Sequence, residues 1–173
     1  MKKIGKSSRK NIFLNTFHNA KQYLTNKGDL IMGLDMMLYK TLQDFGDVAA
    51  PEQDTFEAWD DLHSKFIEVG YWRKDNHIHN WFVENVQDGV DKCHIHKVSV
   101  EALKELKNTC LEVLEDHDLS ESYLPTSSGF FFGSTDYNEF YFEGIEDTVE
   151  IIDNCLEMFS KNPELKFYYQ SSW

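Results

Sequence analysis

The chain has 173 residues, of which 41% are hydrophobic and 14% aromatic, and its formal net charge is −13. This length suits one domain, and the aromatic content excludes an intrinsically disordered chain. No stretch approaches the ~20 apolar residues of a membrane-spanning helix, and the start lacks the apolar core of a secretion signal. Three cysteines, an odd number, suit reduced thiols, so we expect a cytoplasmic protein.

The first 31 residues form a basic extension on an acidic body. Seven of the 17 Lys and Arg residues lie there with one acidic residue, so residues 1–31 carry +6 and residues 32–173 carry −19. Such a split marks either a disordered leader or a basic arm that contacts nucleic acid or the acidic body. The codons of residues 27–32 can also encode a ribosome-binding site before Met32, which would make residues 1–31 upstream read-through. We therefore expect a single domain over residues 32–173.

The first half of this body alternates between strand-like and helix-like patterns. Apolar residues alternate after Gly33, Pro51 suits the first turn of a helix, and Asp75 or Asn76 suits a helix cap. These signals predict, in order, a strand over 33–40, a helix over 51–67 that ends before Gly70, a helix over 76–88 and a short strand over 93–98.

The second half is mainly helical. Ser99 caps a third predicted helix, and a stretch rich in Ser, Thr, Pro and Gly over 120–129 interrupts the pattern. Residues 129–142 form either a hairpin or a loop whose second half begins a helix. A fourth helix follows from Ile145, and residues 165–169 alternate as a strand. The predicted fold is α+β, with about four helices on a small sheet that joins both ends of the body.

Two histidine-containing runs are the first candidates for chemistry: HIH at 77–79 and CHIH at 93–96. Imidazole and thiolate groups are ligands for zinc and other transition metals. However, histidines two residues apart point in different directions on a helix. A strand places His94 and His96 on one face and Cys93 on the other. We therefore predict structural histidines, no metal site and no cofactor.

The run YWRK at 71–74 is the second candidate. Arg73 is the only arginine beyond residue 31. Its planar guanidinium can bind a phosphate or carboxylate while neighbouring aromatic rings stack on a planar group. The alternative is a structural ion pair for Arg73 and a place in the core for Trp72.

The run PTSSGFFFGST at 125–135 is the third candidate. Two glycine-bounded, hydroxyl-rich turns can present backbone N–H groups to an anion. The run lacks the lysine of a nucleotide-binding loop and the GxSxG of a hydrolase. The alternative is a buried strand between two tight turns, and a ligand site requires this loop to meet Arg73 in space.

Specific strings spread through the body make it resemble a known group of proteins. They are MGLDM at 32–36, VGYWRK at 69–74, IHNWFV at 78–83, the run from LPT at 124 through 141, and YYQSSW at 168–173. On these strings the chain resembles a family of small uncharacterised proteins encoded by bacteriophages and prophages, mostly of Gram-positive bacteria. The resemblance implies phage origin and an accessory role in infection, such as counter-defence, and carries over no catalytic residue.

We therefore predict a phage accessory protein that acts by binding a small anionic, nucleotide-like ligand or a host defence protein. Cationic side chains would pair with charge, aromatic rings would stack, and hydroxyls and an amide would donate or accept hydrogen bonds. The predicted site consists of Trp72, Arg73, Lys74, His79 and Asn80 on one wall and Ser128, Ser134, Thr135 and Tyr137 on the other.

Two alternatives follow from other features. The acidic body can mimic the phosphates of nucleic acid and inhibit a host DNA- or RNA-binding protein, and its charge argues against direct nucleic-acid binding. An enzyme that processes nucleotides would instead use His79, or a metal held by His94 and His96.

Overall fold

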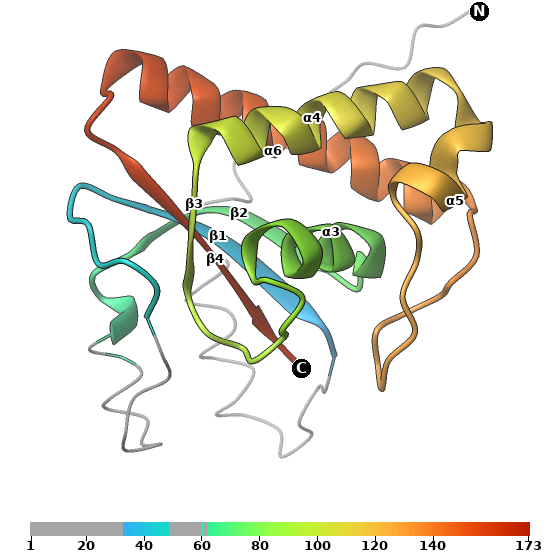
Figure 1. Ribbon diagram of the computed structural model, residues 1–173, viewed down its shortest axis with the longest axis horizontal. Coiled ribbons are helices and arrows are strands. Elements are labelled where there is room, and N and C mark those ends of the chain that lie inside the picture. The colour runs from blue at the N-terminus through green and yellow to red at the C-terminus, as the bar shows by residue number, and fades with distance from the viewer. Residues whose placement is uncertain (1–32, 49–59, 61) are drawn as a thin grey trace, which may run out of the picture. The chain divides into compact units, whose positions relative to one another are not determined.

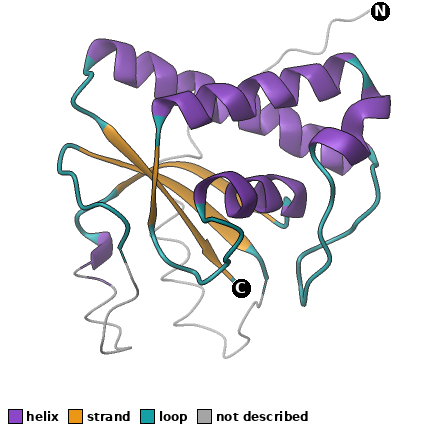
Figure 2. Cartoon of the chain, viewed as in Figure 1, coloured by secondary structure: helices purple, strands orange, loops and turns teal. Residues whose placement is uncertain are grey.

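A computed structural model describes residues 33–48, 60 and 62–173 of the chain (Figure 2). Contacts separate Met1–Met32 from Gly33–Trp173, and every described residue belongs to the second unit. The predicted basic extension over residues 1–31 lies outside the described residues. The described part has the predicted α+β fold, with helices packed on one antiparallel sheet.

Four antiparallel strands form the sheet in the order β2-β1-β4-β3. β1 and β4 pair along their whole length, with Asp35 opposite Ser172 and Thr41 opposite Lys166. The two ends of the body therefore meet in the middle of the sheet, as the alternation at each end predicts. The strands are β1 (Asp35–Thr41), β2 (Ile67–Arg73), β3 (His96–Val98) and β4 (Lys166–Ser172).

Helices cover one face of this sheet, with α4 and α6 side by side and α3 next to them (Figure 1). The helices are α3 (Asn76–Val86), α4 (Val100–Glu115), the single turns η1 (His117–Leu119) and α5 (Ser120–Tyr123), and α6 (Glu139–Lys161). Ser99 and Asn138 accept hydrogen bonds from first-turn amides, which defines where α4 and α6 begin. Within the described part of the chain, no helix is long and apolar enough to span a membrane.

The main core lies between these helices and the sheet. Leu38, Trp72 and Tyr169 point from the strands into it, and Phe82 and Ile152 point from α3 and α6. Phe82 stacks on Tyr169, with ring centroids 3.9 Å apart. Apolar burial on this scale is the dominant stabilising force in the fold.

The second strand corrects the prediction for this region. Most of the helix predicted over 51–67 lies outside the described residues, but Ile67 and Gly70 belong to β2. Gly70 is needed inside the strand because a Cβ there would overlap the side chain of Ile151 in α6. Residues 71–74 therefore end a strand rather than join two helices.

Residues 129–142 follow the second of the two predictions. Residues 129–138 form a loop without a strand, and α6 begins at Glu139. The interrupting stretch over 120–129 also contains α5, a single helical turn.

A smaller aromatic cluster covers the opposite face of the sheet, where Tyr39, Phe66 and Tyr168 pack with Ile95. The rings of Phe66 and Tyr168 lie 5.1 Å apart in an edge-on arrangement. Leu62 and His63, which have helical backbone, also pack against this cluster, which supports the face of the sheet opposite the main core.

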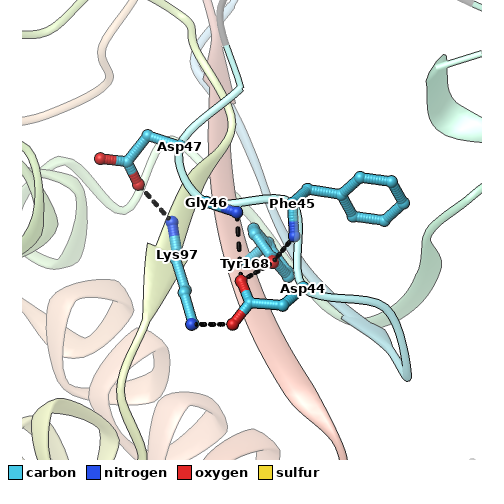
Figure 3. Close-up of polar contacts among 6 residues, drawn as sticks. All are labelled: Asp44, Phe45, Gly46, Asp47, Lys97 and Tyr168. Carbon is cyan, nitrogen blue, oxygen red and sulfur yellow. Dashed lines mark hydrogen bonds and ion pairs between the residues drawn. The ribbon is translucent and has the colours of Figure 1, made fainter.

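Polar contacts hold the loop after β1 over this cluster (Figure 3). The Phe45 amide donates to the Tyr168 hydroxyl at 2.8 Å, and the Gly46 amide donates to Asp44 at 3.1 Å. Lys97 of β3 pairs with Asp44, and its own amide donates to Asp47 at 2.9 Å. The bonds join β3, β4 and the loop, so this end of the sheet is structural.

Candidate functional site

The candidate site lies where β2 ends and α3 begins. Side chains alternate along β2, so Trp72 enters the main core and Arg73 points to the other face, where its side chain is 38% exposed. Lys74 follows at the turn and is exposed. We call the exposed side chains of Arg73 and Lys74, which pack over the buried Gly33, the cationic corner.

Arg73 is oriented by a carboxylate on the neighbouring strand. Its Nε lies 3.9 Å from Asp35 Oδ1, and Tyr71 donates its hydroxyl to the same oxygen. Burial and Asp35 raise the pKa of Tyr71, so the hydroxyl remains a donor. Asp35 thus directs the guanidinium without a close ion pair that would occupy its donors.

Arg73 and Lys74 converge on the same glycine. A Cβ placed on Gly33 would lie 3.3 Å from Arg73 Nη2 and 3.7 Å from Lys74 Cε. Within the described residues, Lys74 has no carboxylate partner and Arg73 has only the long contact to Asp35. Two adjacent cations therefore lie on the surface of an otherwise acidic body with only one long carboxylate contact, made by Arg73, and this favours an anion.

The loop over residues 125–137 packs against this corner, as a ligand site requires. A Cβ placed on Gly133 would lie 2.9 Å from Lys74 Cβ and 3.0 Å from the Lys74 carbonyl oxygen. Lys74 and Phe131 both have a φ of 66°, the left-handed region that non-glycine residues seldom adopt. Strain at two residues near one contact is typical of a functional surface.

Asn76 is the residue that fixes the loop. Its Nδ2 donates to the carbonyls of Phe132 at 3.1 Å and Ser134 at 2.8 Å, and its Oδ1 accepts from the Ser127 amide at 2.9 Å. One buried side chain at the start of α3 therefore holds both arms of the loop beside Lys74. The prediction named Ser134 and Lys74 but missed Asn76.

The tip of the loop presents aromatic rings to solvent. Phe130 is 78% exposed and Phe131 is 45% exposed, and their ring centroids are 4.1 Å apart. Phe132 turns inward instead, over Gly129 and against His79, whose ring centroid lies 5.4 Å away. The tip can therefore offer a stacking surface next to the cationic corner.

The loop hydroxyls of the predicted site differ in whether they are free to form a hydrogen bond with a ligand. Ser134 donates to Asp136 at 2.9 Å, and the Tyr137 hydroxyl accepts from the Thr126 amide at 3.4 Å. The side chains of Ser128 and Thr135 are exposed and make no hydrogen bond within the described residues. Ser128 and Thr135 are thus the two hydroxyls with free bonding capacity.

Trp72 corrects the predicted stacking role. Its side chain is buried against Phe82, and its Nε1 donates to Thr148 at 2.8 Å. Trp72 is therefore a core residue, as the alternative for this run proposed. Asn80 is half-buried on α3 and makes no side-chain hydrogen bond within the described residues, so it stays a candidate.

His79 is also buried rather than exposed to a ligand. Its Nε2 lies 2.8 Å from Asp91 Oδ2, and its Nδ1 lies 2.8 Å from the Tyr169 hydroxyl. Burial alone would raise the pKa of Asp91, but hydrogen bonds from His79, Ser171 and Trp173 lower it. An ionised Asp91 accepts from Nε2, and Tyr169 donates to Nδ1. Both ring nitrogens are therefore used inside the fold, which leaves none for a substrate.

Asp75 adds a titratable group directly behind Lys74. Its carboxyl group packs against Gly144 of α6. Burial raises its pKa to about 6, and the nearby Asp147 carboxylate adds to the shift. At neutral pH this carboxylate reduces the positive potential of the corner.

The histidines of the second run lie together as predicted. The rings of His94 and His96 are 6.2 Å apart and nearly parallel. His96 Nδ1 lies 3.9 Å from Asp47, and burial lowers the pKa of His96. The described residues contain no group of three or more ligating side chains placed to hold a metal ion.

The site therefore combines two converging cations, an orienting carboxylate, two exposed rings and two free hydroxyls. The signals that sequence reasoning missed are Asn76, Asp35 and Gly33, because their roles depend on contacts between distant parts of the chain. Comparisons with protein families, with curated proteins and with solved structures found no match for this chain.

Proposed function

We propose that this protein acts by binding, and that its ligand is a small anion attached to a planar ring, such as a nucleotide. The observation that carries the proposal is the convergence of Arg73 and Lys74 on Gly33. A guanidinium that keeps free donors binds phosphate oxygens in pairs, and the lysine adds a point charge.

The neighbouring loop supports a ligand with a ring. Phe130 and Phe131 are exposed at the tip of the loop that contacts Lys74 through Gly133, and stacking on such rings is tolerant of base identity. The loop is pre-positioned by Asn76, which lowers the entropy lost on binding. A prebuilt wall of this kind suits a binding protein.

The buried histidine argues for binding rather than turnover at this site. A general base needs a free nitrogen within reach of the substrate, and both nitrogens of His79 are occupied by Asp91 and Tyr169. In the setting that the resemblance implies, the protein would act as a phage accessory factor that binds a host signalling or metabolic nucleotide during infection.

Calorimetric titration of the full chain tests the proposal with three probes: ADP, pyrophosphate and adenosine. We expect ADP to bind more tightly than either fragment, because pyrophosphate lacks the ring and adenosine lacks the charge. Arg73→Ala should weaken ADP binding about tenfold or more, since a hydrogen bond to a charged group contributes about 1.5–3 kcal/mol.

The matched control is Lys104→Ala, which removes an exposed lysine of α4. Its affinity for ADP should equal that of the unmodified protein. Equal affinity of the Arg73→Ala variant, or no heat with either ADP or pyrophosphate, would show that the cationic corner is not an anion site.

A further inference from the structure

α5 and the start of α6 lie beside each other at the end of the loop away from its tip, and this region carries exposed aromatic side chains (Figure 1). Three rings point outward here: Phe140 is 68% exposed, Tyr123 is 44% exposed and Tyr137 is 38% exposed. Large apolar side chains gathered at one place on a surface commonly mark an interaction site.

A buried tyrosine ties together the two segments that carry these rings. The Tyr141 hydroxyl donates to the Leu124 carbonyl at 2.9 Å, which ties the end of α5 to the start of α6. Tyr137 packs edge-on against Tyr141 with ring centroids 4.9 Å apart. Tyr123 and Phe140 are the chain neighbours of Leu124 and Tyr141. The patch is thus built on a fixed framework.

Carboxylates surround the patch, and cations are absent from the surrounding chain. Residues 108–160 contain 13 acidic residues and no Lys or Arg. Glu121, Glu139 and Glu143 are exposed, and within the described residues none of them forms an ion pair. The two lysines that pair with α6, Lys107 and Lys161, contact Asp153 and Glu157 near its far end.

From this arrangement we infer that Tyr123, Tyr137 and Phe140 form a docking surface for a protein segment that carries Lys or Arg around an apolar side chain. The rings supply an anchor of the kind that dominates interface energy, and the surrounding carboxylates supply complementary charge. Glu139 and Glu143 carry negative charge that no cation pairs with in the described residues. A basic segment would pair with this charge, whereas a neutral or acidic segment would not, so the proposed partner is basic.

This surface has the opposite charge to the cationic corner and contains neither Arg73 nor Lys74, although Tyr137 also belongs to the loop that packs against the corner. The corner uses Arg73, Lys74 and the loop tip to attract an anion, whereas the acidic–aromatic patch would repel one. The inference therefore does not depend on the proposed ligand. A protein with both surfaces can hold a small ligand and a basic partner at the same time.

The test uses the full chain and a synthetic peptide of lysine, arginine and leucine without acidic residues. Two-dimensional NMR should show shifts confined to the amides of α5, of the residues around Tyr137 and of the first turns of α6. Phe140→Ser and, independently, Tyr123→Ser should each weaken binding about tenfold, as truncation of an interface anchor does. Glu139→Gln combined with Glu143→Gln should also weaken it and reduce its salt dependence.

The control variant is Leu42→Ser, which removes an apolar side chain that is 65% exposed outside this surface, and its affinity should not change. A control peptide with glutamate at every basic position should not bind. Peptide affinity that falls with salt but is unchanged by both aromatic substitutions would overturn the inference. Binding would then result from general charge attraction and not from the aromatic rings. Shifts outside α5, the residues around Tyr137 and the first turns of α6, or no shifts at all, would also overturn it.

Discussion

His79 and Arg73 lie on either side of the turn between β2 and α3, and the fold uses them in opposite ways. His79 is buried with both ring nitrogens bonded to Asp91 and Tyr169. Arg73 is exposed, with a long contact to Asp35 and an interaction with the Tyr71 hydroxyl. A satisfied buried group contributes to stability, whereas an exposed cation with free donors is available to a partner. Hydrogen-bond donors that remain unused in the folded protein therefore distinguish Arg73, the proposed binding residue, from the structural His79.

The largest expected effect is the loss of His79. The His79→Ala variant leaves the buried Tyr169 hydroxyl without its partner and creates a cavity, so we expect about 3 kcal/mol of destabilisation. Urea unfolding followed by fluorescence measures it. His94→Ala is the control, since His94 makes no hydrogen bond within the described residues. A loss similar to that of the control would mean that the buried network is not structural.

Asn76 comes next, because it connects the stable interior to the binding surface. Asn76→Ala removes three hydrogen bonds from the loop and should cost about 2 kcal/mol in unfolding free energy. It should also weaken ADP binding, since the loop would no longer be held beside Lys74. Asn85→Ala, which removes one bond on the exposed side of α3, should do neither. If Asn76→Ala reduced stability but left the affinity for ADP unchanged, the position of the loop would not contribute to ligand binding.

Asp75 predicts a dependence on pH. Its pKa is about 6 in the folded protein against 3.8 as the ordinary value, so the folded state binds more protons between these values. The contribution of Asp75 to stability therefore falls as pH rises from about 4 to about 6 and is constant above that range. Asp75→Asn should leave stability unchanged near pH 4 and raise it by about 2 kcal/mol at pH 7.5.

Unfolding of both proteins across this pH range measures the effect. A stability difference that does not change with pH would show that Asp75 is not a buried titrating group. Removing this negative charge behind Lys74 should also strengthen ADP binding at pH 7.5.

The smallest expected effect on stability belongs to Arg73. Its contact with Asp35 is long and partly exposed, so Arg73→Ala should change the free energy of unfolding by less than about 0.5 kcal/mol. The same variant should give the largest loss of ADP affinity. A substantial loss of stability would instead support the structural ion pair considered for this arginine.

Local sequence patterns correctly predicted the helices and strands whose caps and hydrophobic spacing lie within one continuous segment of the chain. The cap at Ser99, the helical spacing after Ile145 and the pairing of both ends in one sheet are all present. α3 begins after Asp75 as predicted, but the Asp75 side chain makes no capping hydrogen bond. The region of β2 was predicted wrongly, as the end of a helix, because a glycine such as Gly70 is compatible with two structures. It can end a helix, or it can allow a helix to cross a strand, and only the contact with Ile151 distinguishes them.

The candidate site was predicted in part for the same reason. In a strand, side chains alternate between the two faces, so Trp72 and Arg73 point in opposite directions. Because residues 71–74 were predicted to join two helices, both side chains were placed on the same wall of the predicted site. The approach of Gly133 to Lys74 and the bonds from Asn76 to both arms of the loop connect residues that are far apart in the chain. No local pattern encodes such contacts.

The place of β4 in the sheet has a consequence for how the protein is made. β4 pairs with β1 on one side and β3 on the other, yet it follows every other element in the chain. On the ribosome, the helices and the outer strands emerge before the strand that joins them. The sheet can close only after residues 166–172 are released from the exit tunnel. Folding therefore depends on contacts of long sequence separation, which are slow to form. Until then β3 lacks β4, its partner strand in the described part of the sheet, and the nascent chain exposes apolar surfaces that chaperones recognise.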